Sequence, residues 1–330
     1  MVSSKDVAKY AGVSQTTVSR VLNTPQLVTK NTYQKVMGAI EELNYIPDGN
    51  ARSLVQKKTG IIALISGPLN NPFYVDTTTS IVNYANQNGF KTNVHFVNNE
   101  NLQETYNAVL ENKVDGIILS SILIKDPIFN KLEKLNIPFI TFNRKHESNQ
   151  YFVEMDNEQA GYLAIEHLIK NGHQAVCWIG GPLNISTFKG RYEGFKKALQ
   201  KNALAIETFT VFNTDTSKEA LYKTFLELEK RPEKPTAICA ATDAIALNML
   251  NFYITAGYKV PEDISIIGID NVEMSGHASI NLTTVGTSSN VGLGQMAIEK
   301  LIEMIDQKNK TCVQITKSVR LFERNTTMKK

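Results

Sequence analysis

The chain has 330 residues, of which 42% are hydrophobic and 20% charged, and its formal net charge is +3. This length can supply two or three hydrophobic cores, so more than one domain is expected. No run of about 18 or more uncharged apolar residues occurs, and the first residues lack the basic-then-apolar order of a secretion signal. These features predict a cytoplasmic protein and argue against a membrane-spanning or exported one.

The charge is unevenly distributed along the chain. Residues 1–60 contain eight basic and four acidic side chains, a net charge of +4, so the remaining residues sum to −1. A basic end joined to a nearly neutral body is expected when only one end of a protein contacts phosphate. The distribution therefore favours nucleic acid as a partner of the N-terminal end.

Cysteine and histidine positions give no sign of a metal site. Cys177, Cys239 and Cys312 are far apart and fit no zinc-binding spacing, so buried free thiols are expected. The five histidines form no metal-binding spacing either. The glycines lack a P-loop or dinucleotide-binding context, and no serine lies in a nucleophile elbow. We therefore expect neither a metal, nor a cofactor, nor an enzyme.

The N-terminal residues predict three short helices, over residues 6–11, 15–23 and 29–44. Serine or threonine stands where each helix should be capped. Gly12 fits the tight turn between the first two helices, because glycine tolerates a left-handed backbone. Two helices joined in this way form a helix-turn-helix, whose second helix is sized for the major groove of DNA.

The outward side of the second helix has the chemistry of base recognition. Arginine can form a forked contact with guanine, glutamine can pair with adenine, and serine or threonine can bond a base edge or a phosphate. An ordinary polar helix surface is the alternative at this point. The outward residues are Gln15, Thr16, Thr17, Ser19 and Arg20.

The run KDVAKYAGVS at residues 5–14, followed by TVSRVLN at residues 17–23, resembles the headpiece of the lactose repressor (LacI/GalR) family. In that family two groups of side chains contact bases. They are the two residues that follow the serine at the end of the first run, and the arginine of the Val-Ser-Arg sequence in the second. The resemblance implies base contacts by Gln15, Thr16 and Arg20. It implies phosphate contacts by Thr17, Ser19 and Asn23.

Residues 47–59 join the headpiece to the body and resemble the hinge helix of the same family, with its Ala-Arg-Ser-Leu signature. The resemblance implies a segment that folds on operator DNA, pairs across a dimer and inserts Leu54 into the minor groove, with Arg52 beside it. A solvated linker is the alternative, because Gly49 and Asn50 are poor helix formers.

From residue 60 onward, short β-branched runs alternate with amphipathic helices. This alternation predicts parallel sheets covered on both faces, and the number of units fits two similar sheets better than one. The expected fold class is therefore α/β: an all-α helix-turn-helix headpiece followed by a body of two doubly wound parallel-sheet subdomains. Expected strands include residues 61–65, 92–97, 116–119, 139–142, 176–179, 238–240 and 264–267, and expected helices include residues 159–171, 191–201 and 244–256.

Polar residues follow several of these strands, at the sheet edge where ligands bind in such folds. An aromatic ring can cover the C–H side of a sugar, and forked charges can bond adjacent hydroxyls, so a polyhydroxylated ligand is plausible. Each residue also has a structural alternative. Asp243 can simply cap a helix, Arg144 can form a surface ion pair, and Phe73 can belong to the core.

Landmarks of the same family recur in order along the body, among them VDGII at residues 114–118, IGGP at residues 179–182 and VPEDISIIG at residues 260–268. By this resemblance the body looks like a periplasmic sugar-binding protein without its signal. The implied limits are 1–46 for the headpiece, 47–59 for the hinge, 60–157 with 287–316 for the N-subdomain, and 158–286 with 317–330 for the C-subdomain.

The resemblance assigns effector binding to Phe73, Arg144, Arg191 and Asp270, with Asn71 and Asp243 as second choices. Two departures bear on the effector. Thr242 stands where asparagine is frequent, and Thr287 stands where glutamine is frequent in ribose binders, so ribose is only a candidate. No leucine heptad closes the chain, which favours a homodimer whose two headpieces read a nearly palindromic operator.

Together these features predict a sequence-specific transcriptional regulator that binds double-stranded DNA, most simply a repressor of a carbohydrate-utilisation operon. A small sugar or sugar-like effector would control it by shifting the population of two conformations. Two alternatives within the family stay open: a phosphocarrier protein as corepressor, and a purine-type corepressor. The residues do not decide between an inducer and a corepressor.

Overall fold

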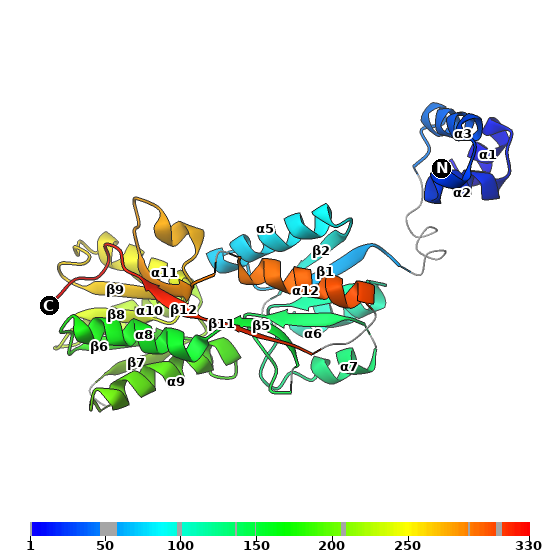
Figure 1. The fold of residues 1–330 in the computed structure, drawn as a ribbon. Coiled ribbons are helices and arrows are strands. Elements are labelled where there is room, and N and C mark those ends of the chain that lie inside the picture. Colours follow the sequence, from blue (N-terminus) through cyan, green and yellow to red (C-terminus); the bar gives the residue numbers. More distant parts are fainter. Residues whose placement is uncertain are drawn as a thin grey trace. The chain divides into compact units, whose positions relative to one another are not determined.

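The computed structural model describes residues 2–46, 58–97, 101–135, 137–148, 150–205, 209–289, 291–307 and 312–330. The chain divides into two compact units, Met1–Gly60 and Ile61–Lys330 (Figure 1). The expected hinge, with Arg52 and Leu54, lies at residues 47–57 outside the described residues, so its helix stays a prediction. No helix of the described ranges is both long and apolar enough to cross a membrane.

The N-terminal unit contains the three predicted helices, with shifted ends. The first begins at Ser4 rather than at residue 6, because Ser3 is itself the N-cap: its Oγ accepts the amide of Asp6, whose carboxylate accepts the amide of Ser3 at 2.9 Å. The elements are α1 (Ser4–Ala11), α2 (Gln15–Asn23), the 3₁₀ turn η1 (Pro25–Leu27) and α3 (Lys30–Glu42). They enclose a small apolar core of Val7, Ala8, Val18, Val21, Val36 and Ala39.

The second unit contains two six-stranded sheets, which confirms the predicted α/β class. The first sheet has the order β11-β5-β4-β3-β1-β2, and all its strands are parallel. Its strands are β1 (Ile61–Ser66), β2 (Lys91–Phe96), β3 (Gly116–Leu119), β4 (Phe139–Phe142), β5 (Tyr151–Met155) and β11 (Val313–Lys317). Its helices are α5 (Pro72–Gln87), α6 (Leu102–Glu111), α7 (Ile128–Lys134) and α12 (Leu293–Gln307).

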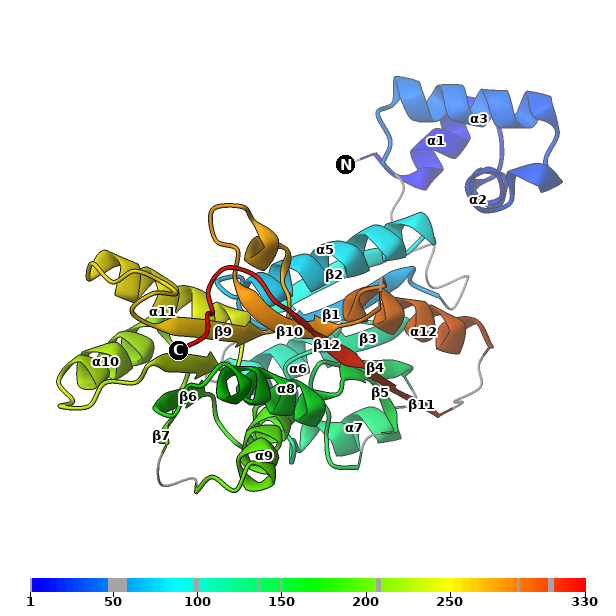
Figure 2. The ribbon, with the colours of Figure 1, turned by 60° about the vertical axis from the view of Figure 1, so that its left-hand side comes forward.

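Helices cover both faces of this sheet, with α5 and α12 on one side and α6 and α7 on the other (Figure 2). The central strands β3 and β4 are buried along their whole length, as their continuous apolar runs predict. We call the part built on this sheet the N-lobe.

The second sheet has the order β12-β10-β9-β8-β6-β7, and we call the part built on it the C-lobe. Its strands are β6 (Val176–Gly180), β7 (Thr210–Asn213), β8 (Ala237–Ala240), β9 (Ser265–Ile269), β10 (Thr283–Thr287) and β12 (Val319–Phe322). Its helices are α8 (Asn157–Lys170), α9 (Ser186–Lys201), α10 (Lys218–Glu229), α11 (Asp243–Thr255) and the 3₁₀ turn η3 (Glu273–Gly276). The edge strand β12 runs antiparallel to β10, so this sheet is not purely parallel as expected.

The chain passes between the lobes three times, after β5, after β10 and after β11. Each lobe is therefore assembled from separate segments, and the residue limits given above for the subdomains stay a prediction. The described cysteines are free. Cys177 and Cys239 are buried as expected, whereas Cys312 is exposed because it precedes the edge strand β11.

Candidate nucleic-acid interface and ligand cavity

Helix α2 presents one polar side to solvent. Its apolar residues Val18 and Val21 are buried in the headpiece core. The exposed side chains are Gln15, Thr16, Ser19 and Arg20, and the partly buried ones are Thr17 and Asn23. All six residues expected to contact DNA are therefore on the surface or at its margin, and the contacts themselves stay a prediction.

Side-chain hydrogen bonds hold part of this helix in place. The Nε2 of Gln15 donates to Ser4 Oγ at 2.9 Å, which ties the start of α2 to α1. The Nδ2 of Asn23 donates to Ser19 Oγ at 3.2 Å, and its buried Oδ1 has no partner among the described residues. Arg20 lies in the last turn of α2, where a positive charge complements the helix dipole.

A cavity of about 410 Å³ lies between the two lobes, at the carboxyl ends of strands from both sheets. This volume is typical of sites for small molecules. Five of the six residues predicted to bind an effector line it: Asn71, Phe73, Arg144, Arg191 and Asp270. Asp243 does not line it. The cavity is also lined by Ser121, Asn143, Phe188, Asp215 and Lys218.

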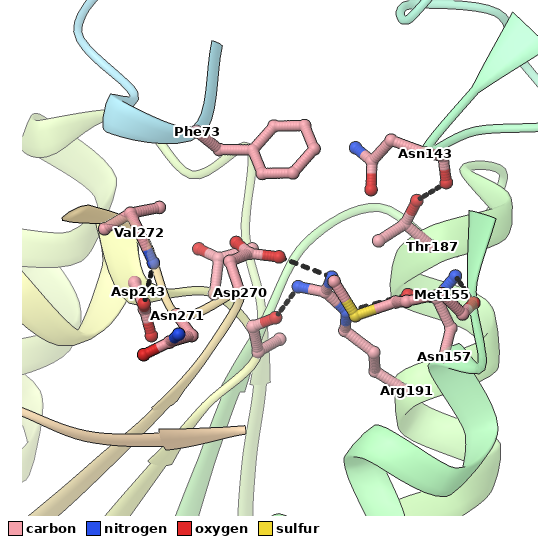
Figure 3. Close-up of polar contacts among 12 residues, drawn as sticks. Phe73, Asn143, Met155, Asn157, Thr187, Arg191, Asp243, Asp270, Asn271 and Val272 are labelled. Carbon is pink, nitrogen blue, oxygen red and sulfur yellow. Dashed lines mark hydrogen bonds and ion pairs between the residues drawn. The ribbon is translucent and has the colours of Figure 1, made fainter. Parts of the chain in front are cut away.

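Arg191 is the largest charged side chain enclosed here, with 0% exposure (Figure 3). Its Nη2 donates to Asp270 Oδ1 at 2.6 Å, its Nε donates to Asn157 Oδ1 at 3.0 Å, and its Nη1 donates to the carbonyl of Ala241. A buried guanidinium is tolerated only when a counter-charge and hydrogen bonds replace water. These contacts supply both and fix Arg191 at the cavity wall.

Close packing of α8 against α9 brings Asn157 to Arg191. A Cβ atom on Gly161 would lie 1.9 Å from the carbonyl oxygen of Arg191, and one on Gly194 would lie 1.9 Å from that of Glu158. Only glycine at these positions lets the two helix backbones touch. The glycines therefore position a polar contact of the cavity although neither of them lines it.

Asp270 has a strained backbone, with φ at 139°, a region that favours glycine. Its amide donates to the carbonyl of Val285 at 2.8 Å, which holds the residue at the end of β9. Burial raises the pKa of Asp270, and the neighbouring Arg191 opposes this shift. The strain and the ion pair together aim a carboxylate at the cavity.

Asp243 has a structural position, but not the helix cap that the sequence allowed: the N-cap of α11 is Thr242, whose hydroxyl accepts the amide of Ile245 at 3.2 Å. Asp243 is fully buried, and its carboxylate accepts the amide of Val272 at 3.0 Å, the hydroxyl of Ser275 at 2.7 Å and the hydroxyl of Thr284. Burial raises its pKa to about 6, and the nearby charge of Asp270 adds to this effect. Asp243 thus holds the loop that carries Asp270, and an expected direct contact with the effector has no support from its position.

Aromatic rings reach the cavity from both lobes. Phe73 lies in the first turn of α5, where the N-cap Asn71 accepts its amide through Oδ1 at 3.0 Å. Its ring lies 6.4 Å from that of Phe142 in a stacked arrangement. Phe188 of α9 lines the cavity from the C-lobe, and a Cβ on Gly181 would lie 2.4 Å from its ring. The sequence reasoning missed Phe188 because an aromatic residue inside a helix is most simply read as core.

Two buried polar side chains of the N-lobe wall were also not predicted. Ser121 is 5% exposed and Asn143 is 7% exposed, and neither Ser121 Oγ nor Asn143 Oδ1 has a hydrogen-bond partner among the described residues. Both line the cavity. Their positions after β3 and β4 were the available signal. Unsatisfied buried groups of this kind are expected where a ligand completes the hydrogen bonding.

Hydrogen bonds close the cavity along its rim by joining the lobes. The hydroxyl of Thr187 donates to the carbonyl of Asn143 at 2.7 Å (Figure 3), and the amide of Lys145 donates to Ser186 Oγ at 2.9 Å. A ligand in the cavity would thus contact residues whose backbones also hold the lobes together. No group of three or more His, Cys, Asp or Glu residues suitable for a metal ion occurs in the part of the chain that the structure describes.

Two family sequence models match the chain. The one described as "Bacterial regulatory proteins, lacI family" matches residues 4–48, and the one described as "Periplasmic binding proteins and sugar binding domain of LacI family" matches residues 58–325. Among curated proteins, the chain is 35% identical to the HTH-type transcriptional repressor PurR of Aliivibrio salmonicida, over 94% of each chain. It is 33% identical to PurR of Glaesserella parasuis, over 94% of this chain and 92% of that one.

Solved structures show the same fold. The Lac repressor bound to ONPG in the repressed state is 29% identical, with a TM-score of 0.83 over 99% of both chains. A LacI family transcriptional regulator from Enterococcus faecalis with bound ribose is also 29% identical, with a TM-score of 0.70 over 82% of this chain and 99% of that one.

Proposed function

Because the chain belongs to the LacI family of DNA-binding transcriptional repressors with a ligand-binding domain, we propose that it represses a carbohydrate-utilisation operon in the cytoplasm. A small sugar or sugar-like effector in the cavity sets its affinity for the operator. The observation that carries this proposal is the cavity of about 410 Å³, which is lined from both lobes and contains the buried pair of Arg191 and Asp270.

In this proposal the headpieces of a homodimer read two half-sites of a nearly palindromic operator. Arg20, Gln15 and Thr16 contact bases in the major groove, because they extend from the exposed side of α2. The phosphate contacts come from Thr17, Ser19 and Asn23, and the minor-groove contacts come from Arg52 and Leu54.

The effector acts by changing the angle between the lobes. The chain crosses between them three times, so a change in this angle moves whole rigid elements. A ligand that contacts Phe73 and Arg144 on one lobe and Phe188 and Asp270 on the other binds one angle more tightly than another. The hinge between body and headpiece then transmits this change in lobe angle to the DNA-binding unit and alters its affinity for the operator.

D-Ribose is the first effector to test. Two related regulators of the same family, 28% and 29% identical to this chain, have structures with bound ribose. The cavity offers two aromatic side chains, Phe73 and Phe188, and a carboxylate, Asp270, which suit the C–H and O–H groups of a sugar ring.

A purine-type corepressor is the second candidate, since the curated relatives named PurR are 32% to 35% identical to the chain over more than nine-tenths of its length. A planar base could also lie between two aromatic rings. The candidates differ in what they require: a sugar needs hydroxyl partners, whereas a base needs a stacking surface.

The test begins with the full-length chain and a library of random DNA duplexes, from which a preferred operator is selected. Fluorescence anisotropy then measures operator affinity with D-ribose, with other pentoses and hexoses, and with hypoxanthine or guanine. The proposal predicts a palindromic site and a sugar that changes its affinity. A response to the purine bases alone would favour the second candidate, and unchanged operator affinity with every compound would contradict both.

A further inference from the structure

The N-lobe wall of the cavity carries polar side-chain groups that have no hydrogen-bond partner among the described residues. Arg144 is half-buried, and its guanidinium, with five N–H groups, makes no hydrogen bond or ion pair with the described residues. Ser121 adds an unsatisfied hydroxyl. Asn143 adds a side-chain amide whose Oδ1, an acceptor, has no partner in the described part of the chain, and a rotation of this amide would turn its NH₂ group toward an anionic ligand. This wall is therefore positively charged and can donate more hydrogen bonds than it can accept.

Asp126, the buried acidic group beside Tyr106, already has hydrogen-bond partners of its own. Asp126 is 3% exposed, and its carboxylate accepts the hydroxyl of Tyr106 at 3.1 Å and the amides of Leu123 and Ile128. It forms no ion pair with Arg144 within 4.0 Å among the residues described. Arg144 does act at longer range, because its charge lowers the pKa of Tyr106 against the larger raising effect of burial.

The C-lobe wall offers acceptors to a ligand, although Lys218 of α10 also adds a cation to it. The donors of Arg191 are used internally, and the hydroxyl of Thr187 donates to the carbonyl of Asn143. Asp270 gives only one of its carboxylate oxygens to Arg191, so acceptor positions remain for a ligand. The exposed Asp215 lies on this wall as well. The C-lobe therefore suits the hydroxyl donors of a ligand.

We propose that the effector is an anionic polyol, a sugar phosphate or a sugar acid, whose anionic group is bound by Arg144, Ser121 and Asn143 while its hydroxyl groups face Asp270. This inference rests on the proposed function, since it concerns the ligand of the same cavity. The proposal specifies the chemical class of the ligand and its orientation in the cavity, in which the anionic group of the ligand faces the N-lobe.

Charge decides between this ligand and a neutral sugar. Arg191 and Asp270 cancel each other at 2.6 Å, which leaves Arg144 and Lys218 facing one exposed carboxylate, Asp215. A neutral sugar would cover part of the half-buried guanidinium of Arg144 without supplying a counter-charge. A phosphate or carboxylate instead forms charge-assisted, forked contacts with it. Lys218 begins α10 and adds positive charge at the rim.

The first experiment is isothermal titration of the full-length chain with matched pairs of probes. One pair is D-ribose and D-ribose 5-phosphate, and the other set is D-glucose, D-glucose 6-phosphate and D-gluconate. We expect at least one anionic probe to bind roughly tenfold or more tightly than its neutral parent, the effect of one charge-assisted hydrogen bond. Comparing the phosphate with the gluconate separates the two sources of charge. Equal or tighter binding of the neutral parents, or no binding of any anionic probe, overturns the proposal.

Variants identify the residue responsible. Arg144→Gln should weaken binding of the anionic probe far more than binding of its neutral parent and so abolish the preference, whereas Arg144→Lys should keep part of it. Ser121→Ala is a second variant that removes a single oxygen atom and should weaken the anionic probe several-fold. The matched control is Lys125→Gln, a cation of the same lobe whose side chain is 79% exposed and which does not line the cavity. An equal loss for both kinds of probe in Arg144→Gln would contradict the assignment.

Failure of this inference is distinguishable from failure of the proposed function. If a neutral sugar binds more tightly and also changes operator affinity, the anionic class is wrong and the sugar-controlled repressor stands. If a probe binds the cavity and operator affinity stays constant, the proposed coupling fails whatever the charge of the probe.

Discussion

Replacing Arg191 with methionine removes one half of a buried ion pair at the cavity. The exposed fraction of the side chain is 0% for Arg191 and 4% for Asp270, and the two are 2.6 Å apart. Methionine keeps an unbranched apolar chain but donates nothing to Asp270, Asn157 or the carbonyl of Ala241. The variant therefore leaves a buried carboxylate without its counter-charge and two acceptors without donors.

The expected cost can be bounded from this geometry. Breaking a buried ion pair by removing one partner typically lowers the free energy of unfolding by about 3–5 kcal/mol. That is a large part of the roughly 5–15 kcal/mol that stabilises an ordinary domain. In the double variant Arg191→Met with Asp270→Asn, no unpaired charge remains, so we expect part of the loss, on the order of 1–3 kcal/mol, to be regained.

Urea unfolding, followed by the fluorescence of Trp178, measures these effects. Trp178 is the only tryptophan of the chain, it is fully buried, and it lies on β6 in the same lobe as Arg191. The pH dependence gives an internal check. Burial already raises the pKa of Asp270, and loss of Arg191 raises it further, so the single variant should gain stability as pH falls and lose it as pH rises through the folded-state pKa.

Two results would refute this reasoning. One is a cost below about 1 kcal/mol for Arg191→Met, since the pair would then not be the source of local stability. The other is a double variant no more stable than the single one. In either case Arg191 would have to be assigned to ligand binding alone.

Three further predictions concern other parts of the chain. Gly194→Ala should destabilise the C-lobe by roughly 1–3 kcal/mol and weaken effector binding, because the new Cβ would meet the carbonyl of Glu158 at 1.9 Å. The control is Gly38→Ala in α3, where nothing lies within 4 Å of the new Cβ, and it should be neutral or stabilising. Equal effects of the two variants in thermal denaturation would contradict the packing argument. Burial raises the pKa of Asp243 from 3.8 to about 6, so its protonated form favours folding and the free energy of unfolding should fall as pH rises through about 6. Asp243→Asn should flatten this part of the plot of unfolding free energy against pH. An unchanged plot in the variant would show that Asp243 is not the titrating group. Arg20→Ala should cost roughly 1–3 kcal/mol in operator binding and relax the preference at one base pair, measured by anisotropy with single-base operator variants; a uniform loss on all sequences would indicate a phosphate contact instead.

The headpiece could be predicted almost completely from the sequence, because its signals are local. Capping serines, Gly12 and apolar residues at helical spacing act within a few residues of one another. Only the ends were displaced. The sequence predicts the first helix from residue 6, whereas α1 begins at Ser4, directly after its N-cap Ser3.

The cavity was predictable in part. The rule that ligands bind at the carboxyl ends of parallel strands pointed to the loops, and the family resemblance then assigned the five residues that line the cavity. Neither could separate Asp243 from them, because the hydroxyls that bond its carboxylate belong to Ser275 of η3 and Thr284 of β10, which are 32 and 41 positions away in the chain. Ser121 and Asn143 were missed for a related reason. Their importance lies in the partners they lack, and that depends on how two lobes built from separate segments close around them.

The direction of β12 has the same kind of cause. Its short run of alternating residues is compatible with either edge orientation, and only the third crossing of the chain makes it antiparallel to β10. The strained backbone of Asp270 could not be predicted either, because no sequence pattern indicates that a residue other than glycine is held at a φ of 139°.

The crossings also decide how a ligand can act at a distance. The amide of Asp156 donates to the carbonyl of Lys317 at 2.8 Å, and the amide of Ser288 donates to the carbonyl of Ser318 at 3.0 Å, so the three crossing segments are joined laterally. Such a band resists shear and permits rotation of one lobe against the other.

A ligand shifts this rotation only by the difference in its affinity for the two angles. An ion that contacts the N-lobe alone, such as inorganic phosphate on Arg144, has the same contacts at every angle and should bind without effect on DNA. A molecule that spans from Arg144 to Asp270 changes its contacts with the angle, so under the proposed function we expect this kind of molecule to alter operator affinity.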